Sequence, residues 1–328
     1  MQMLDFQHIL EDYYPEFVRH RRRTANAIAR LLNILFLQKR FKQFEHKYSG
    51  LEGFDFVSAA LTFFDFSIRL PESQKARIPA TGRLVIASNH PIGSLDGIAL
   101  LDLVRQVRTD VRVVANGMLM HLKPLHSVLL PVNNMSGSTT RRDLLAIRKH
   151  LESDSVLIIF PAGEVSRLGL KGVRDGLWNN GFVKLASATK APILPIFMGG
   201  RNSAFFYGLS ALVKPLSTAW LIREMFKQQH KTVDVHIGRP IPYSTYSANG
   251  FSTTTLAAMF KTHVYQLASS TKPVFESVES VAQPELRSVL IEELAHCDHL
   301  GSTPDGKQIY LTTMAQSPCI MREIGVLR

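Results

Sequence analysis

The chain has 328 residues, of which 45% are hydrophobic and 20% are charged, and it carries a formal net charge of +11. A chain of this length and composition can bury the core of one large domain or of two smaller ones, which excludes a disordered protein. The positive charge predicts an anionic partner, such as membrane headgroups, nucleic acid or an acidic carrier protein, and the two cysteines exclude a disulfide framework and fit a reducing compartment.

Residues 1–70 are predicted to form a basic and aromatic helical region. The first 17 residues include acidic side chains and lack a long apolar run, so they are not a signal peptide. No stretch approaches the roughly 20 apolar residues of a membrane-spanning helix. One or two helices are predicted over 16–48, basic at both ends, and another over 53–70, where apolar residues recur at helical spacing: Phe54, Val57, Leu61 and Phe64.

Two interpretations of this N-terminal region stay open. Its helices can form a layer that packs against the rest of the protein, which is the commoner arrangement. Alternatively, they can lie on a membrane, with Lys and Arg facing the headgroups and Leu and Phe entering the acyl boundary. The second interpretation gains weight only if other residues point to a lipid ligand.

From about residue 82 to residue 248, short β-rich runs alternate with helical patterns. This rhythm is typical of an α/β fold with a mainly parallel central sheet flanked by helices. We therefore predict one core domain over 71–248. The predicted strands are 84–87, 111–114, 156–160, 193–197 and 233–237, and the predicted helices are 98–108, 139–152 and 176–189.

The rhythm weakens after residue 248. Residues 249–305 are predicted to form C-terminal helices and a linker, with helices over 255–269 and 284–295. Residues 306–328 offer a short strand, a Ser-Pro break and a helix, so this segment is predicted to be the truncated start of a second domain.

The stretch SNHPIGSLDG, residues 88–97, follows the first predicted strand of the core. Pro91 keeps His90 out of a helix and Gly93 permits a sharp bend, so a turn followed by a helix opening near Ser94 is predicted. His90 and Asp96 then gather at the carboxyl end of a strand, where α/β sheets bind ligands. They are either a general base with its orienting carboxylate or only the polar residues of a turn.

Two further loops follow predicted strands and share the same edge of a parallel sheet. They are FPAGEVSR, residues 160–167, and the loop that ends the run 193–200. Glu164 and Arg167 are therefore predicted to surround one pocket with His90, although Glu164 can equally cap a helix and pair with Arg167. The chain has no Gly-x-Ser-x-Gly elbow and no cysteine near this stretch, which favours direct attack by an acceptor over a covalent intermediate.

The motifs NHPIGSLDG, FPAGEVSR and ILPIF, over roughly residues 53–245, resemble three of the four motifs of the PlsC-like acyltransferases. The resemblance implies transfer of an acyl chain from an acyl-carrier-protein or coenzyme A thioester to a lipid acceptor, with no cofactor and no metal. His90 would be the base and Asp96 its orienting carboxylate. Gly163 and Glu164 would help to bind the acceptor and Pro195 would shape the pocket wall. The full predicted substrate-binding set is Asn89, Gly93, Gly163, Glu164, Ser166, Arg167 and Pro195.

Several positions depart from the common family pattern. Five residues instead of four separate His90 from Asp96, and the usual Phe-Pro-Glu-Gly-Thr-Arg is here Phe-Pro-Ala-Gly-Glu-Val-Ser-Arg. The place of an expected phosphate-binding arginine holds Asn133 and Asn134. These departures resemble the hemolysin-like branch, related to the acyltransferase domain of bifunctional ornithine-lipid synthases. Asp175, Trp178 and the run 181–186 resemble that branch too, and 317–328 resembles the opening of the synthases' second, N-acyltransferase domain.

The resemblance predicts a lipid acceptor, an acyl carrier protein or coenzyme A thioester and a membrane surface as partners, and no nucleic acid. It favours a cytoplasmic protein, peripheral on the inner face of the cell membrane. The acceptor is predicted to be the hydroxyl of a lyso-ornithine lipid or lysophospholipid. An N-acyltransferase that makes an amino-acid lipid and a non-catalytic protein that binds anionic lipid remain as alternatives. Backbone amides near Gly93 or at a helix start are expected to stabilise the oxyanion, and His296–His299 is interpreted as metal-free.

Overall fold

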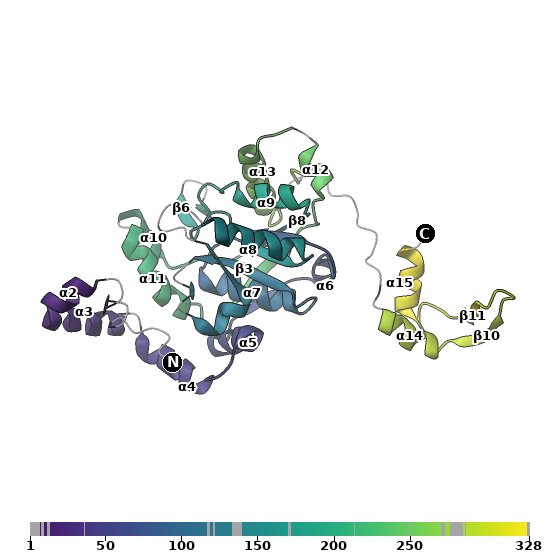
Figure 1. Cartoon of the computed structure of the whole chain (residues 1–328), viewed down its shortest axis with the longest axis horizontal. Coiled ribbons are helices and arrows are strands. Elements are labelled where there is room, and N and C mark those ends of the chain that lie inside the picture. Colours follow the sequence, from purple (N-terminus) through teal and green to yellow (C-terminus); the bar gives the residue numbers. More distant parts are fainter. Residues whose placement is uncertain are drawn as a thin grey trace. The chain divides into compact units, whose positions relative to one another are not determined.

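The computed structural model describes residue 7, residues 10–11, and residues 14–326 except for 36, 117–118, 121, 133–139, 170–171, 213, 249, 270–272, 276–284 and 286. The chain forms two compact units, Met1–Glu276 and Ser277–Arg328 (Figure 1). The domain boundaries expected after residues 248 and 305 therefore differ from the one observed. The first is displaced because the helix that follows residue 248 packs on the core, and the second because a β-hairpin pairs across it.

A seven-stranded sheet forms the centre of the first unit, in the order β1-β9-β8-β2-β5-β3-β4. All its neighbouring strands pair in parallel except β8 and β9, which pair antiparallel. The predicted mainly parallel α/β fold is thus confirmed. The strands are β1 (Ser67–Arg69), β2 (Leu84–Ser88), β3 (Val111–Asn116), β4 (Leu129–Val132), β5 (Val156–Ile159), β8 (Ile193–Met198) and β9 (Thr232–Ile237).

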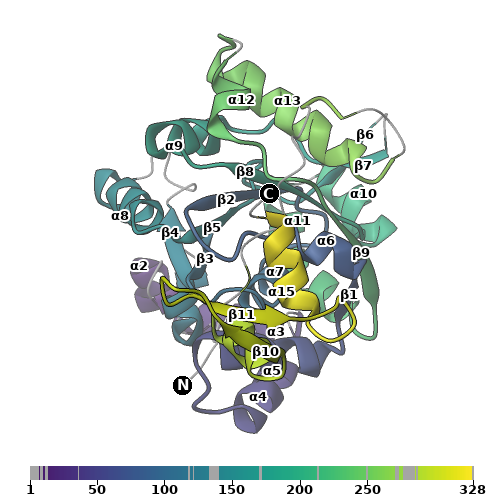
Figure 2. The ribbon, with the colours of Figure 1, turned by 90° about the vertical axis from the view of Figure 1, so that its right-hand side faces the viewer.

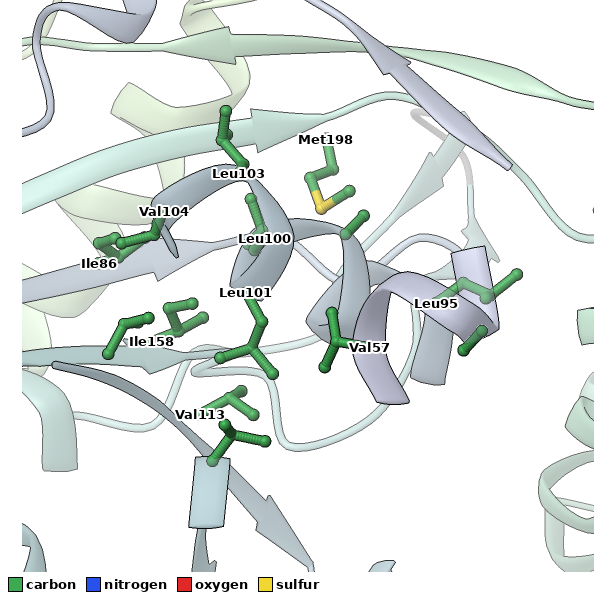
Figure 3. Packing of buried hydrophobic residues seen from close by; sticks show 14 of the residues in the cluster. Val57, Ile86, Leu95, Leu100, Leu101, Leu103, Val104, Val113, Ile158 and Met198 are labelled. Atoms are coloured by element: carbon green, nitrogen blue, oxygen red, sulfur yellow. The ribbon is translucent and has the colours of Figure 1, made fainter. Parts of the chain in front are cut away.

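Helices cover both faces of this sheet, because the side chains of the central strands β2, β5 and β8 alternate between two apolar clusters. In β2, Leu84 and Ile86 belong to one cluster, whereas Val85 and Ala87 belong to the other. Figure 3 shows the first cluster, in which Leu100 and Leu101 of α7 lie against the sheet. Figure 2 shows α9, α12 and α13 on the opposite side of the sheet from α4 and α5.

The helices of the first unit are α2 (Pro15–His20), α3 (Arg22–Leu35), α4 (Gln38–Lys47), α5 (Gly53–Phe64), α6 (Glu72–Lys75), α7 (Ser94–Arg105), η2 (Lys123–Val128), α8 (Arg141–Glu152), α9 (Gly181–Thr189), α10 (Ala204–Leu212), α11 (Lys214–Phe226), α12 (Tyr243–Ser247) and α13 (Thr253–Gln266). A small antiparallel hairpin joins β6 (Arg167–Gly169) to β7 (Gly172–Arg174). Among the described residues, no helix combines the length and the apolar character needed to cross a bilayer.

The N-terminal helices differ in what they pack against. Phe41 and Phe44 of α4 and Val57 of α5 belong to the first core cluster, so the helix predicted over 53–70 is a layer of the core. That helix ends at Phe64, and a core strand follows it. In α3, by contrast, the apolar side chains of Ile28, Leu31 and Ile34 are exposed.

The five predicted core strands are confirmed, and the structure adds elements that the sequence patterns did not predict. The short strands β1 and β4 have too few residues to show alternation, and β4 contains a proline. Helices α10 and α11 carry apolar residues without a clear amphipathic period, which hides them from pattern reading. The helix expected over 176–189 begins only at Gly181, because the residues before it form a loop.

The second unit contains α14 (Arg287–Ala295), the antiparallel hairpin of β10 (Asp298–Ser302) and β11 (Gln308–Leu311), and α15 (Pro318–Val326). Helix α15 begins at the predicted Ser-Pro break. Its first free amides, those of Cys319 and Ile320, donate to the carboxylate of Glu293. The ring of His296 contacts the Glu292 carbonyl and that of His299 contacts Gln308. The metal-free interpretation of 296–299 stays a prediction.

Candidate active site

The loop between β2 and α7 is a sharp turn built by its own residues. Pro91 cannot donate a backbone hydrogen bond, and Gly93 adopts a φ of 123°, a conformation that side chains disfavour. Helix α7 then begins at Ser94, where the sequence predicted its start. The turn folds the chain back so that His90 and Asp96 meet at the carboxyl end of β2.

His90 and Asp96 form the predicted pair. His90 Nδ1 lies 3.0 Å from Asp96 Oδ2, and that oxygen also accepts the amides of Ile92 at 2.9 Å and Gly93 at 3.0 Å. The Asp96 side chain is fully buried, whereas 19% of the His90 side chain is exposed. Since a carboxylate can only accept on the Nδ1 side, it favours a proton on Nδ1 and leaves the lone pair of Nε2 free to act as a base.

The amide of Gly93 donates to Asp96, so the oxyanion would have to bind other backbone amides near this turn or at a helix start, which stays a prediction. The conformation of Gly93 shapes the turn, and an added Cβ would lie 3.6 Å from Val165. The role of Gly93 is therefore to let the turn bend rather than to bind substrate with its amide.

Phe160, at the end of β5, covers one face of the His90 imidazole. The two rings stack with centroids 4.2 Å apart and an interplanar angle of 23°. We did not predict a role for Phe160. The signal was its position, directly after a buried strand and directly before the Pro161-Ala162-Gly163 turn.

The loop after β8 holds the catalytic loop from one side. Asn89 and Met198 bond to each other twice, from Asn89 Nδ2 to the Met198 carbonyl at 2.8 Å and from the Met198 amide to Asn89 Oδ1 at 2.7 Å. Asn202, a residue that the sequence analysis missed, donates to the carbonyls of Pro91 and Ile92. Because Asn89 is buried and both of its polar atoms are used, its predicted role in substrate binding is corrected to one in holding the loop.

Ser166 also holds the loop that carries His90. Its amide donates to the His90 carbonyl at 2.8 Å, and its hydroxyl donates to Asp175 Oδ1 at 2.5 Å. Only 1% of Ser166 is exposed. Its predicted substrate contact is therefore corrected as well, because the hydroxyl is buried and faces the protein.

Glu164 and Arg167 lie on either side of Ser166, whose amide donates to the His90 carbonyl, and their place in one pocket with His90 stays a prediction. Their side chains are 3.4 Å apart, and that of Glu164 is 38% exposed. Arg167 also donates to Ser210 Oγ at 2.5 Å, and its guanidinium lies 5.2 Å from the centre of the Phe206 ring. The ion-pair interpretation is confirmed and the helix-cap interpretation of Glu164 is wrong, because a hairpin follows it instead of a helix. Gly163 forms the turn before them with a φ of 67°.

Pro195 lies inside β8 and not in a pocket wall, which corrects the expectation. It is paired with Ala87 of β2, and its carbonyl accepts the amide of Gly238 at 2.9 Å. An added Cβ on Gly238 would come within 2.7 Å of the Pro195 ring. Pro195 therefore packs the sheet behind the site.

The α10–α11 hairpin lies beside β6 and covers the turn that carries the catalytic pair (Figure 1). Leu221 of α11 approaches Gly93, and Phe206 and Tyr207 of α10 cluster with Val165. The hairpin is tied down by Glu224, which accepts the amide and the hydroxyl of Ser203. No sequence pattern predicted the α10–α11 hairpin over this turn.

Two other features lie apart from this site. A cavity of about 550 Å³ is lined by the far end of α7, where Arg105 donates to Asp102 at 2.9 Å and to Ser58 at 2.6 Å. These groups satisfy one another, so we assign the cavity no chemistry. Asn133 and Asn134, named in the sequence analysis, lie outside the described residues.

The chain is similar in sequence to known acyltransferases. Residues 16–272 match the profile of a family described as acyltransferase. Two proteins named lyso-glycine lipid O-acyltransferase, from Bacteroides thetaiotaomicron and Phocaeicola vulgatus, are each 34% identical over 201 residues. The matched region is 59% of this chain and 73% and 71% of theirs. The crystal structure of the 1-acyl-sn-glycerophosphate acyltransferase PlsC from Thermotoga maritima aligns with a TM-score of 0.43 and 16% identity, over 81% of this chain and 95% of that one.

Proposed function

This chain belongs to the acyltransferase family and is an acyltransferase, and we propose that it transfers a fatty acyl group from a thioester to the hydroxyl of a lyso-lipid. The observation that carries the proposal is the pair of His90 and Asp96, which presents a histidine base at the sheet edge. The two relatives that act on lyso-glycine lipid support an acceptor of the amino-acid lipid class. The acyl group would be supplied as a thioester of an acyl carrier protein or of coenzyme A.

The proposed reaction is a direct transfer. Nε2 of His90 takes the proton from the acceptor hydroxyl while its oxygen attacks the thioester carbonyl carbon. The tetrahedral intermediate collapses, the carbon–sulfur bond breaks, and the leaving thiolate takes the proton back from the imidazolium. Asp96 stabilises that imidazolium during the cycle.

One observation supports direct transfer over a covalent enzyme intermediate. The hydroxyl of Ser166, the serine of the second loop, is buried and donates to Asp175. The acceptor's polar group would then lie near Glu164 and Arg167, the partly exposed charges on either side of Ser166.

Analysis of the reaction products tests this function. Purified protein is incubated with a lyso-glycine lipid and either acyl-coenzyme A or an acylated carrier protein, and products are identified by mass spectrometry. The expected product gains one acyl group through an ester, which mild alkali cleaves. An alkali-stable amide would instead assign N-acylation of an amino acid, and no product with either donor would contradict the proposal.

The enzyme is also proposed to work at a membrane, as a peripheral protein of the cytoplasmic inner face. Helix α3 carries Ile28, Leu31 and Ile34, which are 36%, 62% and 75% exposed. Their spacing places them on one side of the helix, and Arg23 and Arg30 are exposed on the same helix. Apolar side chains flanked by basic ones are typical of a helix that lies on anionic lipid.

Leu31→Asp combined with Ile34→Asp is expected to weaken binding to vesicles that contain anionic phospholipid. Burying each side chain stabilises the bound state by about 1.5–3 kcal/mol, so the loss is roughly 100-fold or more in the partition constant. Co-sedimentation measures it. The matched control is Leu144→Asp with Leu145→Asp on α8, where the leucines are 53% and 56% exposed. Equal binding by the two variants would contradict the membrane role of α3.

A further inference from the structure

We propose that Asp175 is a positioning residue, which holds the main chain of His90 so that its imidazole meets the acceptor. This inference rests on the proposed function, in which His90 is the base. Asp175 lies in the loop between β7 and α9, and only 5% of it is exposed. It is therefore not at the surface where substrate would bind.

The Asp175 carboxylate accepts hydrogen bonds from three separate donors. Oδ1 accepts the amide of His90 at 3.2 Å and the hydroxyl of Ser166 at 2.5 Å, and Oδ2 accepts Trp178 Nε1 at 2.8 Å. Three donors that converge on one buried carboxylate fix its orientation. It links the catalytic loop to the loop that precedes α9.

His90 is in this way held from both ends of its main chain. Its amide donates to Asp175, and its carbonyl accepts the amide of Ser166 at 2.8 Å. The side chain is held separately by Asp96 and by the stacked ring of Phe160. The contacts to Asp96 and Phe160 orient the ring, whereas those to Ser166 and Asp175 decide where the whole residue lies.

Asp175 is in turn anchored to α13. Its amide donates to the Tyr265 hydroxyl at 2.7 Å, and Lys261 Nζ donates to the carbonyls of Asp175 and Gly176 at 2.8 and 2.7 Å. Burial raises the pKa of Tyr265, so that hydroxyl stays neutral, and burial lowers the pKa of Lys261. The position of the base is thus tied, through Asp175, to a residue of α13 that lies 90 positions after Asp175 in the chain.

Asp175 touches no reacting atom in the proposed mechanism, and its effect must pass through His90. A displacement of about 1 Å at a catalytic group can cost roughly 100-fold in rate without changing what the substrate contacts. Replacing Asp175 is therefore expected to lower kcat and to leave KM unchanged. A purely structural residue would lower the folded fraction and leave the turnover of each folded molecule unchanged.

The test is Asp175→Asn, which keeps the size of the side chain. The new amide nitrogen cannot accept a hydrogen bond. It must therefore face either Trp178 Nε1 or the two donors at Oδ1, the His90 amide and the Ser166 hydroxyl, and the hydrogen bonds on that side are lost. We expect kcat per folded molecule to fall about 10- to 100-fold, with KM for both substrates within threefold. Circular dichroism and a thermal melt give the folded fraction.

Trp178→Phe is the matched control. It removes the donor at Oδ2 and leaves the contact between Asp175 and His90, so kcat is expected to stay within about threefold. The double variant Asp175→Asn with Trp178→Phe removes the conflict between two donors and leaves an oxygen for the His90 amide. Its kcat should recover toward that of Trp178→Phe, and this variant also serves if Asp175→Asn does not fold.

Hydrogen exchange of the His90 amide provides a readout that does not depend on activity. Asp175→Asn should speed this exchange, and Trp178→Phe should change it little. Unchanged exchange at His90, or unchanged kcat in a variant with a lowered melting temperature, would overturn the inference. If the wild-type protein forms no acylated product, the proposed function fails, and if His90→Ala retains activity, the assignment of His90 as the base fails. If His90→Ala is inactive and Asp175→Asn turns over normally, only the role of Asp175 fails.

Discussion

We expect His90→Ala to lower kcat for ester formation by about 10³- to 10⁴-fold, because a positioned general base contributes on that scale. The imidazole joins the buried carboxylate of Asp96 to the partly exposed edge of the sheet. KM for the acyl donor should change little, since the donor needs no contact with the free Nε2 before the reaction starts. Initial rates at saturating donor and acceptor measure the effect.

His126→Ala is the control for this variant. His126 is an exposed histidine of η2 whose ring contacts the Met120 carbonyl, so its loss tests for a general effect of removing an imidazole. It should keep kcat within about twofold of the wild-type value. A His90→Ala enzyme with more than a tenth of wild-type turnover would show that another group takes the proton.

We expect Asp96→Asn and Asp96→Ala to differ, and the structure gives the reason. The amides of Ile92 and Gly93 both point at the oxygen that faces His90. In Asp96→Asn these donors select the carbonyl oxygen for that place, so the bond to Nδ1 and the tautomer persist and only the negative charge is lost. We expect a fall in kcat of about 10- to 100-fold for Asn and of roughly 10³-fold or more for Ala, where the bond is lost too.

Asp102→Asn on the same helix is the matched control for the Asp96 variants. Its carboxylate pairs with Arg105 at 2.9 Å, at the opposite end of α7 from the site, so kcat should not change measurably. The three variants are compared by kcat and by the melting temperature. Equal kcat for Asp96→Asn and the wild type would mean that the charge of Asp96 does not stabilise the imidazolium.

Local sequence patterns were sufficient to predict five of the seven strands of the central sheet and the contact between His90 and Asp96. Short apolar runs separated by turn residues are local signals, and the strands at 84–87 and 156–160 were found from them. His90 and Asp96 are six residues apart, and the residues that bring them together, Pro91 and Gly93, lie between them. Because every part of that turn is local, the pair could be predicted without knowing the rest of the fold.

The surroundings of His90 and Asp96 depend on contacts between distant parts of the chain, which only the tertiary structure shows. The contacts from Asp175 to His90, from Asn89 to Met198 and from Asn202 to Pro91 join residues 85, 109 and 111 positions apart. Asn89, Ser166 and Pro195 were therefore assigned to substrate, although the fold turns the first two onto loops of the site and packs the third inside the sheet. A buried side chain takes its role from the donors and acceptors that packing brings to it, and packing over such separations leaves no local pattern in a sequence.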